Sequence, residues 1–182
     1  MTTQLFGGAI TLSIPVSFID ASTLRQVPDN QEVYVDTASS ASLIIEILES
    51  VTDTEDYTKF HYAQLAEDNE AIIDEKQPLR TSVRLDLQSN RNLKLETHIV
   101  GGIQYAAKFN TVVKDQISVF LAVVRVPAPY SADILISLNA PFGETDATLM
   151  NAVWSVENNP ALAAFYRIVS SFCINDYSLF AQ

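Results

Sequence analysis

The 182-residue chain is 48% hydrophobic and 18% charged, a balance typical of a globular protein and not of a disordered one. It carries 22 acidic residues against 11 basic ones, and the net charge of −11 disfavours nucleic acid and anionic lipid while favouring a basic protein partner. The length fits one globular domain spanning residues 1–182.

The first predicted elements are strands. The segment LFGGAI at 5–10 is strand-like, and apolar and polar residues alternate at 9–14 until Pro15 ends the run. Turn-forming residues at 27–30 lead to a second alternating strand at 33–36. The opening MTTQLFGGAI has neither a basic segment nor a long apolar run, so we expect no signal peptide.

Two helices are predicted next. Residues 39–51 contain isoleucines, which favour a strand, but their apolar positions fall on one helical stripe, and this spacing predicts a helix. Glu46 and Glu49 would then share its exposed face. Thr54 is the expected N-cap of a second helix that runs through 57–65.

The second half of the chain is dominated by predicted strands. The charged stretch 69–92 is largely irregular, although alternation inside it indicates a strand. The glycine pair at 101–102 predicts a tight hairpin turn between flanking strands. Apolar strands follow at 116–126 and 133–138, and Asn159-Pro160 begins a C-terminal amphipathic helix.

This order of elements predicts an α+β fold in one domain. Helices at both ends of an antiparallel run would cover the two faces of one sheet, giving a three-layer α/β/α sandwich with a central, mainly antiparallel sheet. The longest apolar segments, at 120–126 and 134–138, fall far short of the roughly 20 residues that a membrane-spanning helix needs. We therefore expect a soluble intracellular protein with no membrane partner.

The residue types that usually carry catalysis are sparse. His61 and His98 are not at metal-ligand spacing, and each is most simply a structural residue near the surface. Cys173, the single cysteine, excludes an internal disulfide, fits a reducing compartment, and is expected to be buried and inert. We expect no catalytic residue, no metal and no cofactor, and hence a protein that is not an enzyme.

Acidic residues are the remaining candidates for a site. Asp20, Asp29 and Glu32 could act as general acids or metal ligands, but their spacing selects neither role. Alternatively, Asp20 caps the turn at 21–22, Asp29 makes an Asx-turn, and Glu32 is simply solvated.

The residue order resembles the Ran guanine-nucleotide release factor family over nearly the whole chain. The PDNQEV block at 28–33 is the most distinctive part of this resemblance. The matching segments are LFGGAI at 5–10, FIDASTLRQVPDNQEVYVD at 18–36, SLIIEILES at 42–50, FHYAQL at 60–65, LAVVRVPAPYSADILISLNAP at 121–141 and DYSLFA at 176–181.

The resemblance implies a small regulator that binds the small GTPase Ran and promotes release of its guanine nucleotide, GTP in particular. We expect this protein to be a monomer. It also implies support of nuclear protein import, a location in nucleus and cytoplasm, and a fold akin to PsbP-like proteins. An acidic surface would contact Ran, with Arg25 orienting a neighbouring carboxylate. The residues carried over to that surface are Asp20, Arg25, Asp29, Glu32, Glu46 and Glu49.

An alternative is a non-catalytic adaptor or trafficking protein that binds other basic partners through the same surface. An adaptor need not change how long Ran keeps its nucleotide, so nucleotide release separates the two. Ala63-Gln64 stands where the family often has an acidic pair, and this departure weakens the expectation that the second helix contributes to binding.

Overall fold

The computed structural model describes residues 2–74, 79–87, 93, 95–107, 114–141 and 159–180. Its main feature is a large sheet in which every pairing between described strands is antiparallel. In spatial order the strands are β3 (Phe18–Asp20), β4 (Gln31–Asp36), β5 (Ser42–Glu49), β10 (Ala132–Pro141), β9 (Lys114–Val126), β8 (Leu95–Ala107) and β6 (Ile72–Ile73), while β7 (Arg80–Leu87) also pairs with β8.

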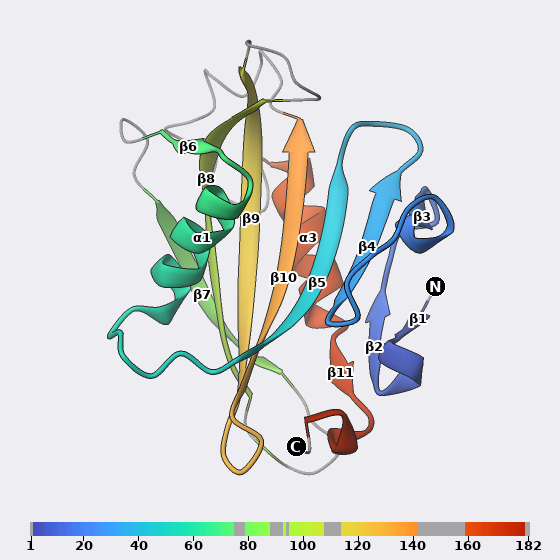
Figure 1. Ribbon diagram of the computed structural model, residues 1–182, viewed down its shortest axis with the longest axis vertical. Coiled ribbons are helices and arrows are strands. Elements are labelled where there is room, and N and C mark those ends of the chain that lie inside the picture. Colours follow the sequence, from blue (N-terminus) through green and yellow to red (C-terminus); the bar gives the residue numbers. More distant parts are fainter. Residues whose placement is uncertain are drawn as a thin grey trace.

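Two helices lie on opposite faces of this sheet (Figure 1). Helix α1 (Tyr57–Asp68) packs over β8 and β9, and helix α3 (Pro160–Ser170) packs behind β9 and β10. A small three-stranded sheet lies on the α3 side and consists of β1 (Thr2–Leu5), β2 (Ile10–Ser13) and β11 (Cys173–Ile174). The chain is therefore a mixed α+β protein, as predicted. No helix among the described residues is long and apolar enough to cross a membrane.

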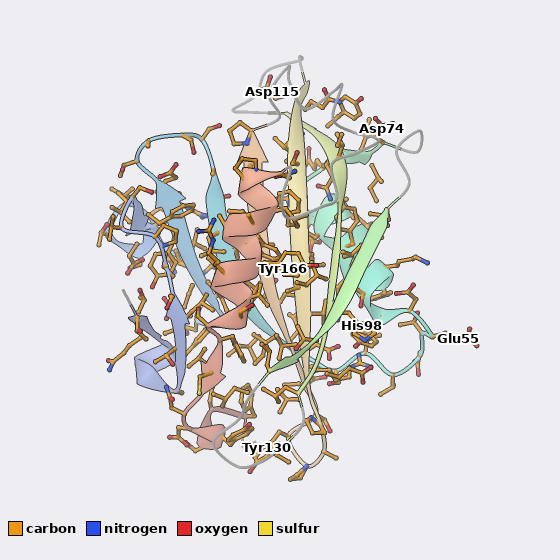
Figure 2. All side chains as sticks on the ribbon, turned by 180° about the vertical axis from the view of Figure 1, so that it is seen from behind. Glu55, Asp74, His98, Asp115, Tyr130 and Tyr166 are labelled. Carbon is orange, nitrogen blue, oxygen red and sulfur yellow. The ribbon has the colours of Figure 1, made fainter. Side chains whose placement is uncertain are left out.

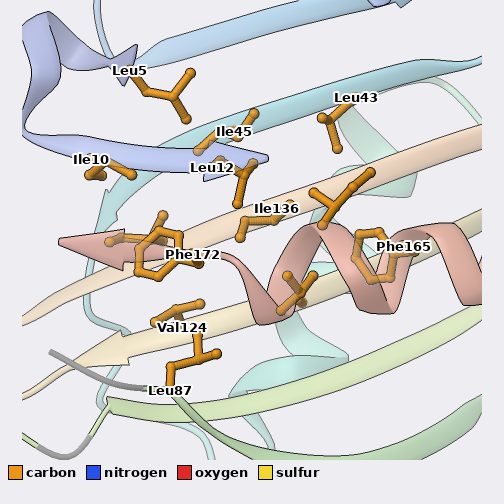
Figure 3. Packing of buried hydrophobic residues seen from close by; sticks show 14 of the residues in the cluster. Leu5, Ile10, Leu12, Leu43, Ile45, Leu87, Val124, Ile136, Phe165 and Phe172 are labelled. Atoms are coloured by element: carbon orange, nitrogen blue, oxygen red, sulfur yellow. The ribbon is translucent and has the colours of Figure 1, made fainter. Parts of the chain in front are cut away.

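Strand β9 shows how the two faces are specified. Successive strand residues point to opposite faces, and β9 is buried on both. Phe120, Ala122 and Val124 join the core under α3, whereas Leu121 and Val123 join the core under α1. Figure 3 shows the larger core, in which Phe165 of α3 faces residues of the sheet. A strand with helices on either side needs the continuous apolar sequence seen here.

The helix predicted at 39–51 is wrong, because this segment forms strand β5. Leu43 and Ile45 point to the α3 side, and Ile44 and Leu48 lie on the opposite side. A strand apolar on both faces cannot be told from a buried helix by periodicity alone, and pairing with β4 and β10 decides the outcome. Glu46 and Glu49 therefore lie on opposite faces of a strand.

The hairpin turn predicted at Gly101-Gly102 is also wrong, because β8 runs through both glycines without a break. Gly102 lies directly under α1. A Cβ atom there would come within 2.8 Å of the Tyr62 hydroxyl oxygen and 3.0 Å of Leu79 Cδ2. The glycine thus permits close helix–sheet packing instead of a bend.

Most other predicted elements are present. They include strands β2 and β4, a strand within 69–92, and the paired strands β9 and β10. The N-cap of α1 is Asp56 instead of Thr54, since the Asp56 carboxylate accepts a hydrogen bond from the Lys59 amide at 3.1 Å. Helix α3 begins after Asn159 as predicted. The strand-like segment at 5–10 contains a 3₁₀ turn at Phe6–Gly8, where Gly7 adopts a positive φ of 66°.

Candidate partner-binding surface

Asp20 and Glu32 lie on the α3 side of the large sheet. Asp20 accepts a hydrogen bond from the Ser22 amide at 2.8 Å and so caps the next turn, as the sequence predicts. Glu32 is not simply solvated, because its carboxylate accepts a hydrogen bond of 2.7 Å from the Phe6 amide and joins the two sheets. Burial, and then the charges of Glu32 and Asp20, raise the pKa of Tyr34 to about 12. These two carboxylates therefore form one cluster around Tyr34.

Glu46 points to the other face, where a groove opens beside the C-terminal end of α1. The Glu46 carboxylate accepts hydrogen bonds from the side chains of Gln31 at 2.9 Å and Asn30 at 3.3 Å. The groove has a volume of about 270 Å³ and an apolar floor. Its polar lining consists of Arg25, Gln31, Glu46, Asp68, Asn69 and Ser137.

The position of α1 explains why this groove is open. Figure 1 shows α1 in front of β8 and β9, whereas β5 and β4 lie to its side and are not covered by it. Exposed Arg25 follows the turn that Asp20 caps, and among the described residues it has no carboxylate partner. Arg25 was expected to orient a neighbouring carboxylate. It instead lines the same groove as Glu46 and Asp68 and forms an ion pair with neither.

Asp29 and Glu49 are both exposed and stand apart from these clusters. Asp29 lies in the turn before β4, next to the asparagine that binds Glu46. Glu49 ends β5, opposite Ala132, and borders a separate hollow. The six predicted contact residues therefore do not form one patch. The structure brings Asp20 to Glu32 and Arg25 to Glu46, on opposite faces of the sheet.

Asp68 and Asn69 were missed by the sequence analysis. They follow the apolar part of α1, where charged residues are usually solvated. Nothing in their spacing indicates that the helix ends against β5 and β10. The Ala63-Gln64 departure weakened the expectation that this helix contributes to binding, yet its C-terminal end lines the groove.

A buried ionic network beside the groove was also missed. Asp133 has no exposed surface, and its carboxylate lies 2.9 Å from His61 Nε2 and 2.8 Å from the Arg125 guanidinium. It also accepts a hydrogen bond from the Val51 amide at 3.1 Å. The Arg125 guanidinium lies over the Tyr57 ring at 3.7 Å. The prediction that His61 is near the surface is therefore wrong.

This network locks α1 to the sheet. Burial alone would raise the pKa of Asp133, but hydrogen bonds from Arg125, His61 and the Val51 amide outweigh it and hold the pKa well below its ordinary value. The groups come from α1, β9, β10 and the segment after β5. Their contacts fix the helix whose far end forms one wall of the groove.

Metal-ligating groups are not assembled in the described part of the chain. No group of three or more histidine, cysteine, aspartate or glutamate side chains there is placed to hold a metal ion. Cys173 is half-buried, so the expected full burial is only partly met. His98 pairs with Glu96 at 3.2 Å and packs near Tyr57.

In the described part of the chain, antiparallel strands and helix α1 form an open groove lined by polar groups, which defines an α+β protein with a candidate binding surface. Comparison with known families defines it further. Residues 3–141 match the family model described as Ran-interacting Mog1 protein, and the chain belongs to this family.

Named relatives cover nearly the whole chain. The nuclear import protein mog1 of Schizosaccharomyces pombe is 33% identical over 196 residues, spanning 98% of this chain and 99% of the relative. The probable Ran guanine nucleotide release factor of Dictyostelium discoideum is 32% identical, spanning 98% of this chain and 95% of the relative. The crystal structure of the Saccharomyces cerevisiae Ran-binding protein Mog1p matches with a TM-score of 0.69 at 27% identity, covering 100% of this chain and 98% of that one.

Proposed function

We propose that this protein binds the small GTPase Ran and promotes release of its guanine nucleotide, GTP in particular, in support of nuclear protein import. The observation that carries the proposal is the family match over residues 3–141, which includes β4, β5 and α1. Relatives of nearly equal length are named for Ran, for nucleotide release or for nuclear import. These names describe a regulator that acts by binding.

The docking surface we propose is the open flank of the sheet around β5. Arg25 and Glu46 would contact the GTPase because they line the groove, and Asp29 because it is exposed in the turn before β4. Asp68 joins them from α1. Glu49 is exposed at the end of β5 on the opposite face of the strand, where it would make a separate contact. Asp20 and Glu32 belong to the same segment but already hold the turn and the small sheet, so they would shape this surface from behind.

Nucleotide release follows from linked equilibria and requires no bond to be made or broken. A GTPase holds phosphate and Mg²⁺ through a lysine-bearing loop and its switch segments. A carboxylate surface docked nearby can compete for that lysine or favour switch conformations that bind nucleotide poorly. A regulator that prefers nucleotide-free Ran must weaken nucleotide affinity by the same factor.

The finer features that we propose follow from the same arrangement. Helices on both faces support a three-layer α/β/α sandwich in one domain spanning residues 1–182. The net charge of −11 supports a partner other than nucleic acid or anionic membrane. We propose a monomer that is a regulator and not a catalyst, needs no cofactor, and acts in nucleus and cytoplasm.

The test is release of a fluorescent GTP analogue from Ran. We expect the native protein to accelerate release, and Glu46→Lys to reduce that acceleration about tenfold, because it places a cation where a carboxylate faces the partner. Asp115→Lys is the matched control. It makes the same charge change near the start of β9 (Figure 2), well along the strand from Val123, which is level with Glu46 through Leu135.

Release that the native protein does not accelerate contradicts the proposal. Binding to Ran without faster release favours the adaptor function. Equal effects of Glu46→Lys and Asp115→Lys contradict the proposed surface while leaving nucleotide release intact.

A further inference from the structure

A second hollow, at the opposite end of β5 from residue 42, belongs to no site described so far. It has a volume of about 170 Å³ and is bounded by three segments that are far apart in sequence. These segments are the end of β5, the loop between β9 and β10, and the 3₁₀ turn Tyr177–Phe180. Figure 2 shows Tyr130 of that loop at the lower end of the molecule. The main lining residues are Ile47, Leu48, Glu49, Tyr130, Leu179 and Phe180.

The C-terminal wall of this hollow is held in place before any partner arrives. The Asp176 carboxylate accepts hydrogen bonds of 2.8 Å from both the amide and the hydroxyl of Ser178. The Tyr177 ring is fully buried and lies 4.9 Å from the Tyr130 ring, measured between centroids. Phe180 packs edge-on against both tyrosines. These contacts order residues 176–180 of the DYSLFA motif, which otherwise has no assigned role.

Chemically, the hollow combines apolar walls with one carboxylate. Leu179 and Phe180 are half-buried, whereas Glu49 is exposed and is the only charged residue among those that line the hollow. A lysine or arginine side chain has matching chemistry, because its methylene stem packs on apolar surface while its cationic end stays at a charged rim. The residues that contribute most to binding energy are often aromatic and lie around well-packed pockets, as the aromatic side chains here do.

We propose that this hollow receives a lysine or arginine side chain of the GTPase partner, and that Leu179 and Phe180 are part of the docking surface. The proposal rests on the proposed function, and it assigns the C-terminal motif to that function. Charge complementarity supports it, since the chain is strongly acidic and the hollow presents a carboxylate. Glu49, already proposed to contact the GTPase, borders this hollow on the face of β5 opposite Glu46.

The experiment measures the Kd for Ran by titration calorimetry with variants at both walls. We expect Leu179→Ala and Glu49→Gln each to raise the Kd about fivefold or more. The double variant should lose less than the product of the two effects, because both residues contact one partner side chain. Leu179→Lys should raise the Kd further, since it places a competing cation beside Glu49, whereas Leu179→Met should bind like the native protein.

Matched controls keep the result interpretable. Val16→Ala removes a similar apolar group that is 88% exposed. Val16 follows the C-terminal end of β2, whereas the C-terminal segment that leads to the hollow pairs with the N-terminal end of that strand. It should leave the Kd unchanged, and thermal melts should show that every variant folds.

Three outcomes would overturn the proposal. If Glu46→Lys weakens binding while the Leu179 variants stay within twofold of native, the hollow is not a docking site and the proposed function stands. If the native protein does not bind Ran, the proposed function fails and this inference fails with it. If Leu179→Lys changes only self-association in sedimentation, the occupant is a second copy of this chain.

Discussion

Asp133 shows how one residue can determine the placement of a helix. Its carboxylate is fully buried and receives hydrogen bonds from His61, Arg125 and the Val51 amide. A buried charge left without partners is strongly destabilising, whereas an exposed pair contributes little. Together with the apolar packing of Tyr57 and Tyr62 on the sheet, this side chain fixes the position of α1, and with it one wall of the groove.

The first prediction concerns the stability that this network provides. Asp133→Ala leaves Arg125 half-buried without its carboxylate, and we expect the free energy of unfolding to fall by about 3–5 kcal/mol. Lys59→Ala is the comparison, because it breaks the exposed pair with Asp56 and should cost about 1 kcal/mol or less. Urea denaturation followed by circular dichroism measures both. Similar losses for the two variants would show that Asp133 is not critical.

A second prediction concerns acid. The pKa of Asp133 in the folded protein lies below its ordinary value of 3.8, so the folded state binds a proton less readily than the unfolded state. The stability that the carboxylate contributes is therefore complete above about pH 4 and is lost as the pH falls below that value.

Asp133→Asn should accordingly flatten the decline in unfolding free energy between pH 5 and pH 2. Asp56→Asn is the control. The pKa of Asp56 is lowered too, as hydrogen bonds and the charge of Lys59 outweigh its burial, but its side chain is 48% exposed and should contribute less. Denaturant titrations at a series of pH values provide the measurement. An unchanged acid decline in Asp133→Asn would contradict this assignment.

At the scale of elements, β5 and β8 are where sequence patterns mislead. The apolar positions of β5 fit a helical stripe and a doubly buried strand equally well. Only its pairing with β4 and β10 separates the two possibilities. The glycines of β8 fit a turn as well as a strand, and the helix packed above Gly102 explains why glycine is required. By contrast, Pro15 predicts where β2 ends, and Asn159-Pro160 predicts where α3 begins, because proline and capping effects are local.

The third prediction tests the contact between α1 and β8. Gly102→Ala places a methyl group 2.8 Å from the Tyr62 hydroxyl oxygen and 3.0 Å from Leu79, and we expect a loss of about 1–3 kcal/mol in unfolding free energy. Adding Tyr62→Phe removes the nearer obstacle, so the double variant should lose less than the sum of the single variants. Additive losses would show that the strain lies elsewhere.

At the scale of the whole molecule, charge and shape act together. A net charge of −11 creates a long-range field that attracts a basic partner but does not choose a docking site. The choice comes from where the helices leave the sheet open. The groove lies beyond the end of α1, and the second hollow lies under the C-terminal turn.

The fourth prediction follows from this division of roles. Raising the salt concentration from about 50 to 500 mM should slow association with Ran about tenfold, because screening weakens the long-range attraction. Dissociation should change far less, since it depends on short-range contacts in the groove and the hollow. Stopped-flow fluorescence measures both rates. An association rate that does not depend on salt would contradict charge-driven encounter.

From the sequence alone, composition and local pattern determined an acidic α+β protein, most of its strands, the capped start of α3, and the family it resembles. The acidic residues of 18–36 and 42–50 were also visible as candidates. Tertiary structure decided that Glu46 and Glu49 point to opposite faces of a strand, that Glu32 joins two sheets, and that His61 is buried against Asp133. It also placed Asp68, Leu179 and Phe180 beside candidate docking sites. The reason is physical: capping and alternation act over a few residues, whereas the face that a residue occupies depends on partners far away in the chain.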